Sequence, residues 1–149
     1  MERSGSQKVL LVLSIIEIIG AILIIIAGLA GYMALAGAGI SANTGDAELN
    51  GVVQGAASGI GFALFIITVI VGGWSLLCGI FGVRAANDNQ KIMIVWVFLL
   101  IGMIIELIGA AMAILNGFMD TSFLSVCGAL VWSVFMFWIA NNIKKEAGR

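Results

Sequence analysis

The sequence predicts an all-α, polytopic membrane protein folded as a bundle of four transmembrane helices. Of its 149 residues, 62% are hydrophobic and 10% are charged, and the mean hydropathy is +1.18. A water-soluble domain needs more charge to cover its surface. Four apolar runs are each near or above the ~20 residues that span a bilayer as a helix. These runs cover about residues 9–36, 59–83, 92–116 and 122–141.

The first apolar run is expected to stay in the protein as a helix. It approaches 28 residues, whereas the apolar core of a cleaved signal peptide has roughly 7–15. Residues 37–58, which follow it, are rich in small residues and are predicted to form an extracytoplasmic loop. Within this loop, "DAELNGVVQGAA" has the composition of a short helix. No external segment is large, so residues 1–149 are predicted to form a single membrane domain.

The basic residues predict the topology. Basic loops stay in the cytoplasm, and all seven Lys and Arg residues lie on one side of the predicted membrane. Both termini are therefore predicted to be cytoplasmic, and the compact loops without an N-x-[ST] sequon favour a bacterial inner membrane. The tail "NNIKKEAGR" is interpreted as part of this signal, with contact to anionic lipid as the alternative. The seven basic residues are Arg3, Lys8, Arg84, Lys91, Lys144, Lys145 and Arg149; the opposite loops hold Asp46, Glu48 and Asp120.

Two similar stretches predict an internal repeat. "SIIEIIGAILIIIAG" at 14–28 and "MIIELIGAAMAILNG" at 103–117 each place a glutamate, Glu17 or Glu106, within an apolar run. The first and third predicted helices match through these stretches. The second and fourth share only "GGWS" and "LVWS". The pattern predicts an imperfect repeat of a two-helix hairpin.

Both glutamates are predicted to point into the bundle. At about 100° per residue along a helix, each shares a face with glycine and alanine, whereas isoleucine and leucine lie opposite. Small faces allow membrane helices to approach closely. Helices 59–83 and 122–141 carry similar stripes of small and hydroxyl residues. The predicted packing positions are Gly20, Gly28, Gly31, Gly72, Ser75, Gly79, Gly102, Gly109, Ala113, Ala129 and Ser133.

Two roles are open for Glu17 and Glu106. A charged side chain at mid-bilayer costs at least about 2.5–3.5 kcal/mol, and no Lys, Arg or His lies within the predicted spans. A neutral carboxyl group can donate a hydrogen bond between helices, worth roughly 0.6–2 kcal/mol. Alternatively, the two carboxyl groups form a proton or cation site of a small transporter or channel.

Several other chemistries find no support in the sequence. The chain has no histidine, no CxxC motif and no cluster with metal-ligand spacing. It has no Gly-rich phosphate loop and no basic patch of the kind that binds nucleic acid. We therefore expect a protein that is not an enzyme and has no cofactor, no metal and no nucleic-acid partner.

One segment carries a family resemblance. "LLCGIFGVRAANDNQKIMIVW" at 76–96 resembles the second helix, turn and third helix of tetraspanins and of the membrane-spanning four-domain family. Glu106 matches the acid that tetraspanins often carry in their third helix. Glu17 falls where they tend to have a polar residue in the first. The chain departs from tetraspanins because Val83 and Arg84 replace their cysteine pair and because their large extracellular loop is missing.

The resemblance implies cytoplasmic termini and a role in organising other membrane proteins laterally. The stretch "EIIG" at 17–20 also looks like the first helix of small multidrug-resistance exporters, but the long 37–58 segment is foreign to them. We predict a small, non-enzymatic structural or partner-binding membrane protein. Its expected partners are the lipid bilayer and either another membrane protein or a second copy of the chain.

Overall fold

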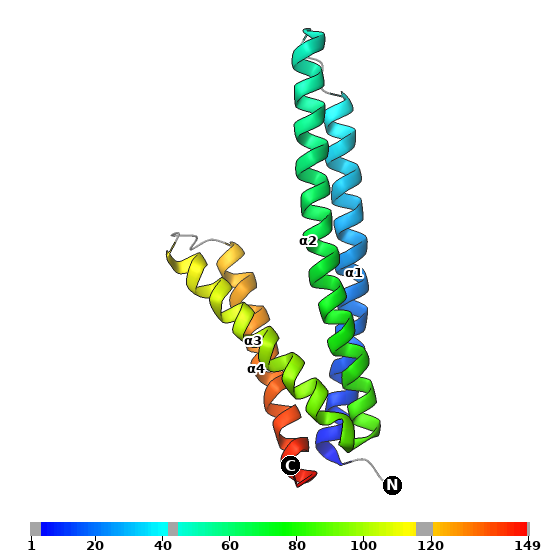
Figure 1. Ribbon diagram of the computed structural model, residues 1–149, viewed down its shortest axis with the longest axis vertical. Coiled ribbons are helices and arrows are strands. Elements are labelled where there is room, and N and C mark those ends of the chain that lie inside the picture. The colour runs from blue at the N-terminus through cyan, green and yellow to red at the C-terminus, as the bar shows by residue number, and fades with distance from the viewer. Residues whose placement is uncertain (1–3, 42–44, 116–120, 149) are drawn as a thin grey trace. The chain divides into compact units, whose positions relative to one another are not determined.

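The chain is helical almost throughout its described part. The computed structural model describes residues 4–41, 45–115 and 121–148 (Figure 1). Each of the four α-helices contains a stretch long and apolar enough to cross a membrane. This confirms the predicted all-α, multi-pass membrane class. The elements are α1 (Gly5–Ser41), α2 (Ala47–Asn87), the 3-10 turn η1 (Asn89–Lys91), α3 (Ile92–Leu115) and α4 (Thr121–Glu146).

The first two helices are longer than the sequence predicted. Within the predicted loop 37–58, all described residues except Gly45 and Asp46 are helical, so the prediction of a long loop was wrong. The helix expected within "DAELNGVVQGAA" is present, as the first part of α2. With 37 and 41 residues, α1 and α2 are about 55 and 62 Å long at 1.5 Å per residue. The hydrocarbon core of a bilayer is only about 30 Å thick. Hydropathy locates the apolar part of a helix, whereas the helix itself continues beyond that part.

Capping residues set where the helices begin. At the start of α1, Gln7 Oε1 accepts a hydrogen bond from the Ser4 amide at 2.8 Å, and Ser4 Oγ accepts one from the Gln7 amide at 3.3 Å. This is a capping box, which pairs amides that a helix start leaves without partners. At α2, Asp46 Oδ1 accepts from the Glu48 amide at 2.9 Å. Gly45 precedes it with φ 79°, a conformation that glycine adopts without strain.

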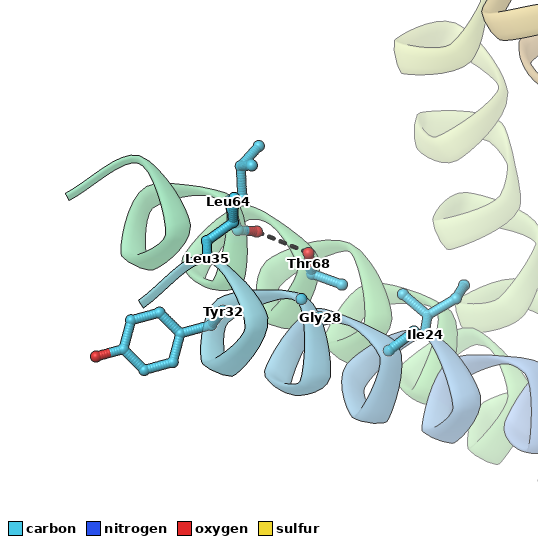
Figure 2. A pocket seen from close by; sticks show the side chains of 8 residues that line it. Ile24, Gly28, Tyr32, Leu35, Leu64 and Thr68 are labelled. Carbon is cyan, nitrogen blue, oxygen red and sulfur yellow. Dashed lines mark hydrogen bonds between the residues drawn. The ribbon is translucent and has the colours of Figure 1, made fainter. Parts of the chain in front are cut away.

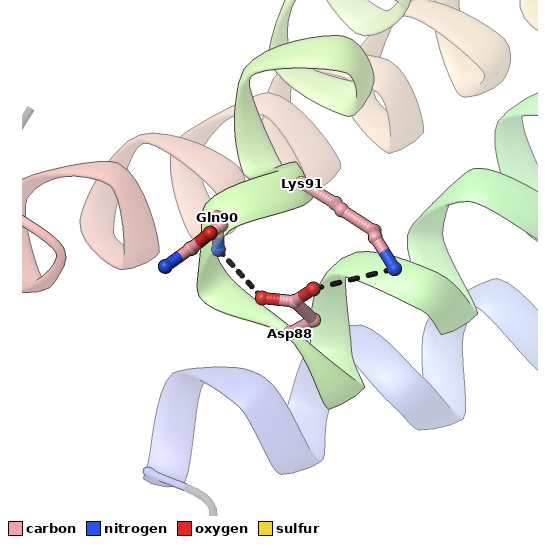
Figure 3. A network of polar contacts seen from close by, with 3 residues as sticks. All are labelled: Asp88, Gln90 and Lys91. Atoms are coloured by element: carbon pink, nitrogen blue, oxygen red, sulfur yellow. Dashed lines mark hydrogen bonds and ion pairs between the residues drawn. The ribbon is translucent and has the colours of Figure 1, made fainter.

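A tight polar turn joins α2 to α3. Asp88 follows the last residue of α2, and its Oδ1 accepts a hydrogen bond from the Gln90 amide at 3.0 Å. Its other carboxylate oxygen lies 3.3 Å from Lys91 Nζ (Figure 3). Asp88 therefore caps the start of η1 and also pairs with Lys91, the last residue of η1. The chain reverses within these few residues and enters α3.

The chain divides into two compact units. Met1–Ile16 and Cys78–Arg149 form one unit, here called the four-helix unit because all four helices contribute to it. Within it, α3 packs along α4. Side chains from α1, α3 and α4 and two alanines of α2 form a common core. The core consists of Leu10, Leu13, Ala85, Ala86, Ile92, Val95, Leu99, Met136, Ile139, Ala140 and Ile143.

The second unit is a helical hairpin. Glu17–Leu77, here called the hairpin unit, contains most of α1 and of α2. These helices run antiparallel and side by side (Figure 1). Their outward surfaces are strongly apolar: Leu23 is 60% exposed and Ile70 is 65% exposed. Exposed aliphatic surface of this extent suits lipid tails rather than water.

Candidate functional site

Glu17 lies at the boundary between buried and exposed faces of α1. Its side chain is half-buried. On the same face, Ser14 and Ala21 are almost fully buried, at 0% and 1% exposure. On the other face, Ile15 and Ile19 are 46% and 54% exposed. The carboxyl group therefore shares the side of α1 that carries its small residues.

Glu106 occupies a similar position on α3. Its side chain is half-buried, and its Oε2 atom is buried. Ile104 and Ile108 are 49% and 57% exposed. The two glutamates belong to different units, Glu17 to the hairpin unit and Glu106 to the four-helix unit. Each carboxyl group is accordingly a separate feature of its own unit.

Glycines bring α1 and α2 into close contact in the hairpin unit. A Cβ atom added to Gly28 would lie 2.6 Å from Thr68 Cγ2, and one added to Gly72 would lie 2.5 Å from Ile25 Cγ1. Real Cβ atoms do not approach other heavy atoms so closely, so both positions require glycine. Gly61 is also tight but less so, because an added Cβ would lie 3.2 Å from Leu35 Cβ. We call Gly28, Gly61 and Gly72 the glycine seam.

An equivalent contact lies in the four-helix unit. Ser14 is fully buried, and its Oγ atom lies where a Cβ atom of Gly82 would be. No hydrogen-bond partner for this hydroxyl lies among the described residues. Serine next to glycine lets the α1 and α2 backbones approach as they do at the seam.

Part of this packing was predictable from the sequence. Gly28 and Gly72 were predicted packing positions, whereas Gly61 and Gly82 were missed. The signal that could have found them is a series of mostly small residues spaced seven apart on each helix. Such spacing is typical of helix pairs that wrap around each other. On α1 the series is Ser14, Ala21, Gly28 and Leu35; on α2 it is Gly61, Thr68, Ser75 and Gly82.

The remaining predicted packing positions differ among themselves. At Gly20, Gly31 and Gly109 an added Cβ would meet no atom within 4 Å among the described residues, so the predicted close packing is not formed there. These glycines lie on faces of α1 and α3 that no other described helix covers closely. Gly79 is buried; Ser75, Gly102 and Ser133 are half-buried; Ala129 is exposed; and the side chain of Ala113 is outside the described part.

An open apolar groove of about 410 Å³ lies on the hairpin unit (Figure 2). Gly28 and Gly31 contribute no side chain to its lining, which is otherwise aliphatic except for Tyr32 and Thr68. The Thr68 hydroxyl donates a hydrogen bond to the Leu64 carbonyl oxygen at 2.6 Å, so its donor is used within α2. The groove therefore offers a ligand little besides apolar contact.

The described residues do not gather a set of metal ligands. Among residues 4–41, 45–115 and 121–148, no three or more His, Cys, Asp or Glu side chains gather so that they could hold a metal ion. No family model, curated protein or solved structure matches the chain. Function therefore has to be argued from the packing and the charges of this chain alone.

Proposed function

We propose that this protein is a non-enzymatic structural component of a membrane, which binds another membrane protein or a second copy of itself. The supporting observation is the use made of small and hydroxyl side chains within the helices. Ser14 and Gly82, and the glycine seam, bring helices together, while Thr68 bonds to its own helix. Packing of this kind builds a rigid helical scaffold rather than a hydrated path.

The proposal extends to location and topology. Basic residues lie near the start of α1 and of α3 and near the end of α2 and of α4. Under the positive-inside rule, this pattern supports cytoplasmic termini. Asp46 and Glu48, at the other end of α2, are then extracytoplasmic. The tetraspanin-like segment at 76–96, the imperfect repeat and the compact loops belong to this proposal, as does a bacterial inner membrane.

Open glycines suggest where a partner helix would approach. Gly31 and Gly109 are exposed, and neither has a neighbouring atom among the described residues that an added Cβ would meet. A photo-crosslinking amino acid placed at each position in native membranes should trap discrete membrane proteins or a second copy. The same group placed at buried Val95 (1% exposed) is the control and should trap neither. Labelling of lipid alone from both open positions would contradict the proposal.

The second candidate function is proton- or cation-coupled transport through Glu17 and Glu106. The observation in its favour is the buried Oε2 atom of Glu106 within an apolar helix. Intramembrane carboxyl groups mark coupling sites in many transporters. A transporter would also present a polar cavity wall, whereas the groove of the hairpin unit is apolar.

A double variant separates the two functions. Glu17→Gln with Glu106→Gln keeps hydrogen bonding but removes ionisation. Proteoliposomes containing the wild type should show no proton or alkali-cation flux above that of empty liposomes. The variant should unfold at the same temperature as the wild type. Wild-type flux that disappears in the variant would establish transport and overturn the structural proposal.

A further inference from the structure

The four helix ends at one end of the four-helix unit are packed into a closed core. Leu10, near the start of α1, and Ile143, near the end of α4, are both fully buried. Ala85 and Ile92, on either side of the α2–α3 turn, are fully buried as well. The polar residues next to these four positions therefore lie around the edge of this core, here called the rim.

Two side-chain contacts tie the helix ends together at this rim. The Ser6 hydroxyl of α1 donates to Glu146 Oε1 of α4 at 2.9 Å. The Lys144 ammonium of α4 lies 4.0 Å from the centroid of the Trp96 ring of α3. A cation over an indole face is attracted by the ring and keeps its charge. The Lys144 charge is thus fixed in place without being neutralised.

The rim is strongly basic. Among the described residues, five cations lie on it against two acids, which leaves an excess of three positive charges. Asp88 pairs with Lys91, and Glu146 accepts a hydrogen bond from Ser6. The side chains of Lys8 and Lys145 are exposed and have no ion-pair or hydrogen-bond partner in the described part of the chain. We call the five cations the basic rim: Lys8, Arg84, Lys91, Lys144 and Lys145.

Apolar surface adjoins the basic rim. Val9 is 43% exposed, Met93 is 39% exposed and Trp138 is 58% exposed. Trp138 precedes Lys144 by less than two helical turns. Exposed tryptophan close to the charged end of a membrane helix is typical of the membrane–water interface. A ligand that fits here carries negative charge at one end and hydrocarbon at the other.

We infer that the basic rim binds the headgroups of anionic phospholipids, whose acyl chains lie along the exposed apolar faces of the four-helix unit. Free phosphate shares the headgroup charge but gains nothing from the apolar faces. The proposal is independent of the partner-binding function, because it requires only the rim charges and the membrane.

Spin-labelled lipids provide the test. The full-length protein is reconstituted into phosphatidylcholine vesicles that contain a trace of spin-labelled phosphatidylglycerol or spin-labelled phosphatidylcholine. The immobilised fraction of each label gives their relative association constant. We expect phosphatidylglycerol to be preferred about two- to fivefold, and high salt to reduce the preference because it screens exposed charges. Equal association of the two lipids with the wild type would overturn the proposal.

Three variants locate the effect. Lys8→Gln with Lys145→Gln removes two exposed, unpaired cations and should lower the ratio, whereas Lys8→Arg with Lys145→Arg should retain it. Glu48→Gln changes the net charge at the other end of α2 and should leave the ratio unchanged. A response to Glu48→Gln as large as that to the lysine variant would exclude the rim as the site. Loss of the preference on adding inorganic phosphate at constant ionic strength would assign the rim to soluble phosphate instead and overturn the lipid proposal.

Discussion

The two units of this protein differ in the size of the side chains that their helices bury against one another. In the hairpin unit, the tightest contacts are at glycines, and the small residue Ala21 is buried at 1% exposure. In the four-helix unit, one such close contact, Ser14 against Gly82, accompanies a core in which large side chains such as Met136 and Ile143 are also fully buried. Two helices cannot surround a large side chain, whereas four helix segments can. Lipid tails are as apolar as leucine, so a helix pair in a membrane gains most from close backbone approach.

The largest predicted effect concerns the four-helix core. Met136→Ala removes a side chain that is 1% exposed and should lower the free energy of unfolding by about 2–5 kcal/mol, because the cavity loses packing contacts. The control is Val131→Ala on the same helix, at a position 68% exposed. Its effect should be below about 1 kcal/mol. Reversible unfolding by SDS titration in mixed micelles, followed by circular dichroism, measures both.

Equal losses in Met136→Ala and Val131→Ala would mean that the core of the four-helix unit does not carry its stability. The contrast between the two units would then fail on the side where it is expected to be strongest.

The next effect concerns the glycine seam of the hairpin unit. In Gly72→Ala the new Cβ would lie 2.5 Å from Ile25 Cγ1 and 3.2 Å from the Ala21 carbonyl oxygen, so the Ile25 side chain or the two helices must shift. Overpacking of this kind should cost about 1–3 kcal/mol. Gly73→Ala is the matched control, because its Cβ would meet nothing within 4 Å among the described residues. Alanine is the better helix former by up to about 1 kcal/mol, so the control should be neutral or stabilising.

The SDS titration also measures this pair of variants. A Gly73→Ala protein less stable than Gly72→Ala would show that the seam does not determine how closely the two helices pack.

The sequence allowed the helical class and the apolar spans to be predicted, because hydropathy reports directly on burial in lipid. It did not allow the full lengths of α1 and α2 to be predicted. Beyond the apolar stretch, α2 is started by the cap at Asp46 and continued by polar residues such as Glu48, and neither feature raises hydropathy.

The packing positions were predicted in part. Helical periodicity found the stripe that contains Gly28 and Gly72, because small residues cluster there. It also selected Gly31 and Gly109, where no close neighbour lies in the described part of the chain. A periodicity defines a face but not what covers it. Gly82 was missed although it lies seven residues after the predicted position Ser75, because its close contact with Ser14 depends on the pairing of α1 with α2.

The helix caps should show a smaller difference between the units. Ser4→Ala removes one acceptor of the α1 capping box, and Asp46→Ala removes the α2 cap; each should cost about 0.5–2 kcal/mol. We expect the smaller local effect at α1, because the Ser6–Glu146 contact also holds that helix start. Amide hydrogen exchange should accelerate more at Glu48 in Asp46→Ala than at Gln7 in Ser4→Ala. The reverse order would show that the α1 start depends on its cap alone.

The smallest effect is expected at the turn between α2 and α3. Lys91→Gln removes an ion pair whose side chains are 56% and 41% exposed, and pairs of this kind contribute about 0–1 kcal/mol. Asp88 keeps its hydrogen bond from the Gln90 amide in the variant, so the turn keeps its cap. The variant should lose less than about 0.5 kcal/mol, and raising the salt concentration should abolish the difference from the wild type. A salt-independent loss comparable to that of Gly72→Ala would instead make this turn, and not the buried core, the element that holds the helix ends of the four-helix unit together.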